Sequence, residues 1–69
     1  MHLEPGMLFI DSRSGQTLEI IDLAYDVTHN TKSVIYKVIS KKFLYDGSRI
    51  RTETEFLTKI EKGDYAPSA

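Results

Sequence analysis

The chain has 69 residues, of which 41% are hydrophobic and 28% charged, proportions that indicate one folded domain and exclude a disordered chain. Its 9 basic and 10 acidic residues give a formal net charge of -1, so no global charge attracts it to nucleic acid or to a membrane surface. It has no cysteine, no apolar run approaching about 18 residues and no N-terminal secretion signal, which predicts a cytoplasmic protein without disulfides, thiol chemistry or a membrane span.

A first short strand is expected at residues 7–11 (MLFID), because the Pro5-Gly6 pair before this apolar segment is a turn signal. A turn cluster follows, and its last member, Gly15, can adopt the positive φ that a tight reversal needs. A second polar loop is expected at residues 28–32 (THNTK), in which Asn30 can adopt the left-handed conformation. These two turns bound the segment between them.

That segment, residues 16–27 (QTLEIIDLAYDV), predicts a second strand. A helix is the alternative, because Leu18, Ile21 and Tyr25 lie at helical spacing. We favour the strand because β-branched residues are frequent and turn clusters lie on both sides. The apolar positions change parity between Ile20 and Ile21, so the strand is expected to bend there.

The longest run rich in β-branched and aromatic residues is at 33–45 (SVIYKVISKKFLY), and it predicts the central strand. Its apolar residues form two sets of opposite parity, Val34, Tyr36 and Val38 in the first half and Phe43 and Tyr45 in the second. A flat strand cannot bury both sets on one side. We therefore expect a bulge near residues 40–42 that returns the second set to the interior.

The pair Asp46-Gly47 predicts a two-residue type I′ hairpin turn. Counting outward from this turn places Phe43 opposite Ile50, with both side chains in the core. The same register places three cationic residues on the opposite face, Lys42, Arg49 and Arg51. The separation into an apolar and a basic face supports the register.

The C-terminal part of the chain predicts a short helical turn and a last strand. Thr52 and Glu55 fit a capping box, in which each residue satisfies a free amide of a helical turn. We expect one short turn that carries Phe56 inward, and then the last strand at residues 57–61. Residues 63–69 contain turn formers and little to bury, so they predict a flexible tail.

Several short motifs occur in an order that resembles a family of short bacterial and phage domains of unknown function. These motifs are Gly6, Gly15, Leu18-Glu19-Ile20, Val34-Ile35-Tyr36, Arg49-Ile50-Arg51 and Phe56. The resemblance covers about residues 5–62 and implies a small SH3-like β-barrel without an enzymatic role. Two positions depart from the family pattern, since Leu18 replaces an aromatic residue and Arg49 replaces a tryptophan.

We therefore expect an all-β fold, a small five-stranded SH3-like barrel with one short helical turn before the last strand. Residues 1–69 form a single domain, with the barrel at about 5–62 and residues 1–4 as a lead-in. A core of this size stabilises a fold by about 3 to 5 kcal/mol. A weak homodimer is left open.

The sequence shows no constellation of catalytic residues. His2 and His29 are the only histidines, and a metal site needs three or four converging ligands. An acidic strip is expected along the first two strands, at Asp11, Glu19, Asp22 and Asp26. Carboxylates that act as acid and base need a cleft that perturbs their pKa, and a barrel this small seldom has one. We expect no enzymatic activity, no metal and no cofactor.

A basic cluster is the one surface feature that suggests a binding site. It comprises Lys37, Lys41, Lys42, Arg49 and Arg51, five of the nine cationic residues within fifteen positions. Like charges across a strand pair are destabilising, so Lys42 opposite Arg51 calls for an anion, either Glu53 or Glu55 or a partner. The cluster is thus a solvated face, a site for an acidic protein, or a site for a nucleic-acid backbone.

These observations predict a small non-enzymatic binding module, a bacterial or phage accessory protein that engages a protein partner. The alternative is a nucleic-acid-binding barrel that uses the basic face around Lys42, Arg49 and Arg51. Aromatic residues interleaved with the cations would favour single-stranded nucleic acid. Phe43 and Tyr45 are instead expected to point away from the basic face.

Overall fold

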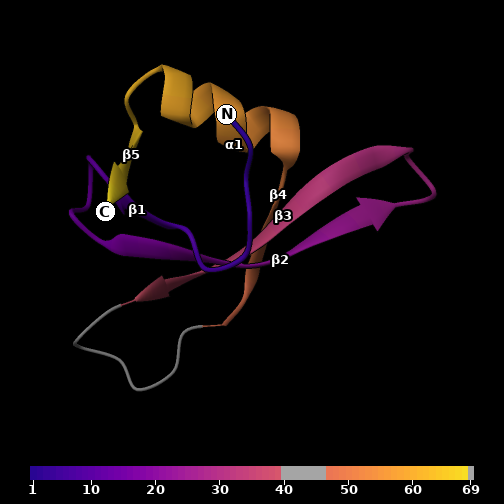
Figure 1. The fold of residues 1–69 in the computed structure, drawn as a ribbon, viewed down its shortest axis with the longest axis horizontal. Coiled ribbons are helices and arrows are strands. Elements are labelled where there is room, and N and C mark those ends of the chain that lie inside the picture. The colour runs from indigo at the N-terminus through magenta and orange to yellow at the C-terminus, as the bar shows by residue number, and fades with distance from the viewer. Residues whose placement is uncertain (40–46, 69) are drawn as a thin grey trace.

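The computed structural model describes residues 1–39 and 47–68, which form one antiparallel sheet and one helix (Figure 1). The elements are β1 (Leu8–Asp11), β2 (Thr17–Asp26), β3 (Thr31–Ile39), β4 (Arg49–Thr52), α1 (Glu53–Glu61) and β5 (Tyr65–Ser68). The strand order is β4-β3-β2-β1-β5, so β4 and β5 are the outer strands and α1 connects them. The prediction of an all-β fold with five strands and a short helix before the last strand is confirmed.

β1, β2 and β3 form an antiparallel meander, as the turn residues predict. Gly15 and Asn30 both have positive φ, 73° and 53°, in the two connections. The β2–β3 register shifts by one residue between Ile20 and Asp22, which confirms the predicted bend in the second strand. The extra residue at the shift changes which side chains of β2 face the core.

The predicted hairpin register is wrong at Ile50. This residue pairs with Ile35 of β3 instead of Phe43, and its side chain is 65% exposed. The physical reason is the position of α1, which follows β4 directly and has to place Phe56 beside Tyr36. When β4 pairs with the first half of β3, α1 begins at a position from which Phe56 reaches Tyr36.

Part of the predicted central strand lies outside the described residues. β3 covers Thr31–Ile39, and the three predicted core residues of its first half, Val34, Tyr36 and Val38, are buried as expected. The bulge predicted near residues 40–42 falls outside the described ranges, as do Phe43 and Tyr45.

Residues 57–61 belong to α1, so the prediction of a last strand there is wrong. The predicted N-terminal cap is confirmed, because the Glu55 N–H donates to Thr52 Oγ1 at 3.1 Å. Phe56 and Ile60 are four residues apart on one helix face, which packs on the core. The segment LTKIE suits a strand and a helix equally well by its local pattern, and this packing decides for the helix.

The predicted flexible tail is also wrong, because residues 65–68 form β5. This strand pairs with β1, with Tyr65 opposite Asp11 and Pro67 opposite Phe9. Proline is tolerated in β5 because the strand lies at the edge of the sheet. The only large apolar residue of the segment, Tyr65, is buried and supplies the burial that the sequence did not suggest.

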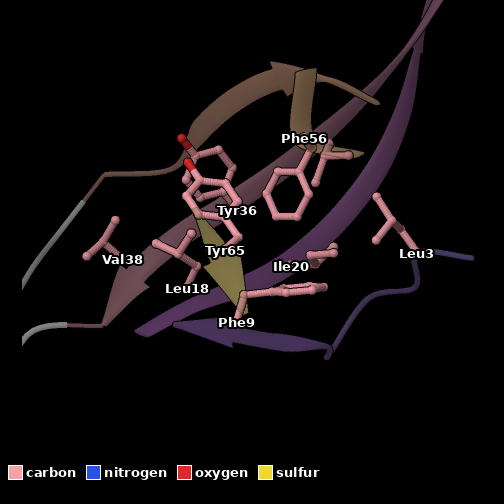
Figure 2. Close-up of a cluster of buried hydrophobic side chains, with 9 residues drawn as sticks. Leu3, Phe9, Leu18, Ile20, Tyr36, Val38, Phe56 and Tyr65 are labelled. Carbon is pink, nitrogen blue, oxygen red and sulfur yellow. The ribbon is translucent and has the colours of Figure 1, made fainter. Parts of the chain in front are cut away.

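Phe56 lies at the centre of the core, with three aromatic rings around it (Figure 2). Its ring centroid is 5.4 Å from that of Phe9, 5.7 Å from that of Tyr36 and 5.1 Å from that of Tyr65. The predicted inward direction of Phe56 and the predicted burial of Tyr36 are therefore confirmed. Leu3 is buried as well, although the sequence predicted only a lead-in there.

The helix covers one part of the sheet and leaves another part uncovered. α1 contacts β3, β4 and β5, and the far end of the β2–β3 hairpin extends beyond it (Figure 1). In β2, Leu18 and Ile20 are buried, whereas residues 21–25 are exposed one after another. Within the described ranges, no helix is long and apolar enough to cross a membrane.

We expect Phe56→Ala to destabilise the fold by about 3 to 5 kcal/mol, because it leaves a cavity among three aromatic rings. A domain of this size has about that much stability in total, so the variant should lack a cooperative urea transition measured by circular dichroism. Ile50→Ala is the matched control, with an expected change within about 0.5 kcal/mol at an exposed site. A cooperative transition in the Phe56 variant would show that this ring does not organise the core.

Candidate functional site

Arg51, a member of the predicted basic cluster, is held between the sheet and the helix. It pairs with Val34, so its side chain leaves β4 on the face that carries the core. Its Nε donates to Tyr36 Oη at 3.2 Å, and its Nη1 donates to Glu55 Oε2 at 3.2 Å. Glu55 is thus one of the two acids expected to compensate the cluster, and it does so from the first turn of α1.

Two phenols lie beside this guanidinium and influence its protonation. Burial by itself lowers the pKa of Arg51, but the hydrogen bond that its guanidinium donates to Tyr36 and the nearby Tyr36 and Tyr65 phenols raise the pKa overall. Burial also raises the pKa of Tyr65, and the neighbouring Tyr36 raises it further. Arg51 is therefore permanently charged and is bound to groups of its own chain.

Lys37 lies on the opposite face of the sheet from Arg51. It pairs across the strands with Glu19, and its Nζ is 3.5 Å from Glu19 Oε1. Both side chains are partly exposed, so an ion pair of this kind contributes about 0 to 1 kcal/mol. Lys37 is thus separated from the other described members of the cluster and has an acidic partner.

Arg49 and Arg51 lie on one face of β4, as expected from their spacing. Arg49 pairs with Tyr36 in the register of the sheet, so both arginines are on the side of β4 that faces α1, whereas Ile50 faces the other way. The predicted separation of Ile50 from the arginines is therefore present, but the apolar residue is the exposed one. Lys41 and Lys42 lie outside the described residues.

A surface cavity lies between the tip of the β2–β3 hairpin and β4. Its volume is about 390 Å³, and Asp26, His29, Ile50 and Arg51 contribute to its lining. The His29 Nδ1 is 2.8 Å from Asp26 Oδ2, and this hydrogen bond is the main reason why the pKa of Asp26 is lowered. Asp26 also accepts the backbone N–H groups of Thr28 and His29, so its carboxylate stabilises the hairpin turn.

The other acids of the predicted strip also have local partners. Asp11 accepts the backbone N–H of Arg13 at 2.9 Å, and Asp22 accepts that of Leu23 at 2.8 Å. Glu19 is paired with Lys37. Within the described ranges, no group of three or more histidine, aspartate or glutamate side chains is placed to hold a metal ion.

The sequence did not predict that the apolar end of β2 is exposed. Ile21 is 40% exposed, Leu23 38% and Tyr25 52%, and Val27 just after the strand is 83% exposed. Leu23 and Tyr25 are opposite Val34 and Lys32, so they share the face that carries the core, where apolar side chains are normally buried. The helix is too short to cover these side chains. The only sign of their exposure in the sequence is the number of apolar residues, which is large for the core of a 69-residue chain.

We expect the stability at alkaline pH to depend on Tyr65. Its folded-state pKa is raised above the ordinary value of 10.0, so its contribution is complete below that value and is lost as pH rises through the folded-state pKa. The urea midpoint should therefore fall from about pH 9 to about pH 11, and less in Tyr65→Phe. Tyr25→Phe, at an exposed phenol, is the control, and equal slopes in all three proteins would contradict the assignment.

Comparison with known proteins gives this chain no relatives from which a site could be transferred. No family model matches the chain, and neither a curated protein nor a solved structure matches it. The resemblance to short bacterial and phage domains therefore remains a prediction. Function has to be inferred from the surface of the protein itself.

Proposed function

We propose that this protein is a small non-enzymatic binding module that engages a protein partner in the cytoplasm. One observation carries the proposal, the run of five exposed residues at 21–25 in β2, with three large apolar side chains among them. Single exposed apolar residues are normal on protein surfaces, whereas a contiguous group commonly marks an interaction site. We call this run, together with Asp26, the open segment of β2.

The composition of this surface suits a protein partner. Tyr25 offers an aromatic side chain of the kind enriched at protein interfaces, and Ile21 and Leu23 add apolar area. Asp22 and Asp26 alternate with Leu23 and Tyr25 along the strand, so they place polar groups on its other face. The local hydrogen bonds of the acidic side chains support a binding role rather than a catalytic one.

The alternative is binding of a nucleic-acid backbone by Lys42, Arg49 and Arg51. Its support is the common face that Arg49 and Arg51 share on β4. Against it stand the acidic partners of Arg51 and Lys37, which neutralise part of the cationic surface. In the open segment of β2, by contrast, the large apolar side chains are exposed to solvent, which favours the protein partner.

Replacing Leu23 and Tyr25 together by serine should remove the protein partner. The tagged wild-type protein and the double variant are compared by affinity capture from cytoplasmic lysate, with and without nuclease. We expect one wild-type band that resists nuclease and is absent from the variant, because both side chains are exposed on one face of the open segment. Ile50→Ser is the matched control at an exposed apolar residue of another strand, and equal capture by all three proteins would contradict the assigned surface.

Fluorescence anisotropy with random single- and double-stranded oligonucleotides at two salt concentrations tests the alternative. We expect no binding at physiological salt, because the net charge is -1. If three cations bound phosphates, log K would fall with log salt at a slope of about -2 to -3. Submillimolar affinity with that slope, abolished by Arg49→Glu, would establish the nucleic-acid function instead.

A further inference from the structure

β2 is an inner strand for only half of its length. Its pairing with β1 ends at Glu19, opposite Leu8, and the last backbone hydrogen bonds on that side join Ile20 to Gly6 and Met7. Ile21 is the extra residue at the register shift, and from Asp22 to Asp26 β2 pairs with β3 alone. Among the described residues no strand lies on the other side of the open segment. The open segment is therefore a sheet edge, although β2 is a middle strand in the strand order.

The bulge determines which backbone groups face this edge. Ile20 directs its N–H and C=O toward β1, and one extra residue follows before Asp22 pairs with Ile35. Asp22 therefore directs its backbone groups toward β3, and Leu23 and Tyr25 direct theirs toward the open edge. The Leu23 N–H is accordingly bound by the Asp22 carboxylate at 2.8 Å instead of by a neighbouring strand.

The two faces of the open segment differ in chemistry. Leu23 is opposite Val34 and Tyr25 is opposite Lys32, so their side chains lie on the face that continues from the core. A cavity of about 310 Å³ lies on this face, with Leu3, Leu23 and Tyr25 in its lining. The other face carries Asp22 and Asp26, which are two acids without a lysine or arginine opposite them in the β2–β3 register.

We propose that the open segment of β2 accepts an extended peptide as an additional antiparallel strand, in which apolar and basic residues alternate. This inference rests on the proposed function and specifies the partner. The backbone groups of an uncovered edge bind an extended chain, and side-chain pockets select its sequence. At this edge the peptide replaces the Asp22 carboxylate as the acceptor of the Leu23 N–H. Apolar residues of the peptide face Leu23 and Tyr25 and the cavity, and its lysines or arginines face Asp22 and Asp26.

Charge favours this occupant over a second copy of the chain paired in the register centred on Ala24. Two open segments paired antiparallel about Ala24 would place Asp22 of each copy opposite Asp26 of the other, and like charges in direct cross-strand pairs are destabilising. A basic strand converts the same two positions into attractive pairs. The free protein is therefore expected to sediment as a monomer at concentrations where the peptide binds.

The test uses a capped eight-residue peptide in which lysine and valine alternate, titrated into the isotopically labelled full chain. We expect nuclear magnetic resonance shifts and slowed amide exchange to concentrate at Leu23 and Tyr25. In an antiparallel pair, the residues opposite Leu23 and Tyr25 form the backbone hydrogen bonds, so N-methylation of the valines should abolish binding. N-methylation of the lysines, whose N–H groups face solvent, should leave the affinity unchanged.

Charge is tested separately with Asp22→Lys, which should weaken binding of the lysine peptide by about fivefold or more. Glu61→Lys, which makes the same charge reversal on an exposed residue of α1, should alter the peptide affinity less than about twofold. The proposal is overturned by equal affinity of the two N-methylated peptides, by equally tight binding of a glutamate-valine peptide, or by dimerisation through the open segment. If lysate capture through Leu23 and Tyr25 persists in any of these cases, strand addition fails and the protein-binding function stands.

Discussion

The packing of Phe56 against three aromatic rings is the interaction on which the rest of the structure depends. Phe9, Tyr36 and Tyr65 come from β1, β3 and β5, so one side chain of α1 joins strands from the middle and from the edge of the sheet. This requirement fixes the position of the helix, and the helix in turn fixes the pairing of β4 with the first half of β3. The same packing also orders the C-terminal segment, because Tyr65 belongs to it.

The same arrangement explains why part of the sheet is left exposed. α1 has nine residues, which cover the aromatic centre but not the far end of the β2–β3 hairpin. The shift between Ile20 and Asp22 divides β2 at this boundary into a buried half and the open segment. A small core and a long hairpin thus produce an apolar surface beside a sheet edge that no other described strand covers, which are the two properties that peptide recognition by strand addition requires.

Several charged residues of the described ranges are engaged within the chain. Arg51 is bound by Tyr36 and Glu55, and Lys37 is paired with Glu19 on the other face. Cations that already have acidic neighbours attract an external polyanion weakly, because each phosphate contact first has to displace an internal one. Asp22 and Asp26 differ from Arg51 and Lys37 in the kind of partner. They are bound by backbone amides and a histidine of the hairpin turn, and not by a lysine or an arginine.

The sequence by itself determined the local features: the meander of the first three strands, the bend at Ile20, the turns at Gly15 and Asn30, the cap at Thr52 and the burial of Tyr36 and Phe56. These follow from side-chain periodicity, turn chemistry and capping, which act over a few residues. Only the tertiary structure decided the pairing of Ile50, the helix at 57–61, the strand at 65–68 and the exposure of Tyr25. Each of these depends on which surfaces one aromatic cluster can cover, and that is a contact between segments distant in the chain.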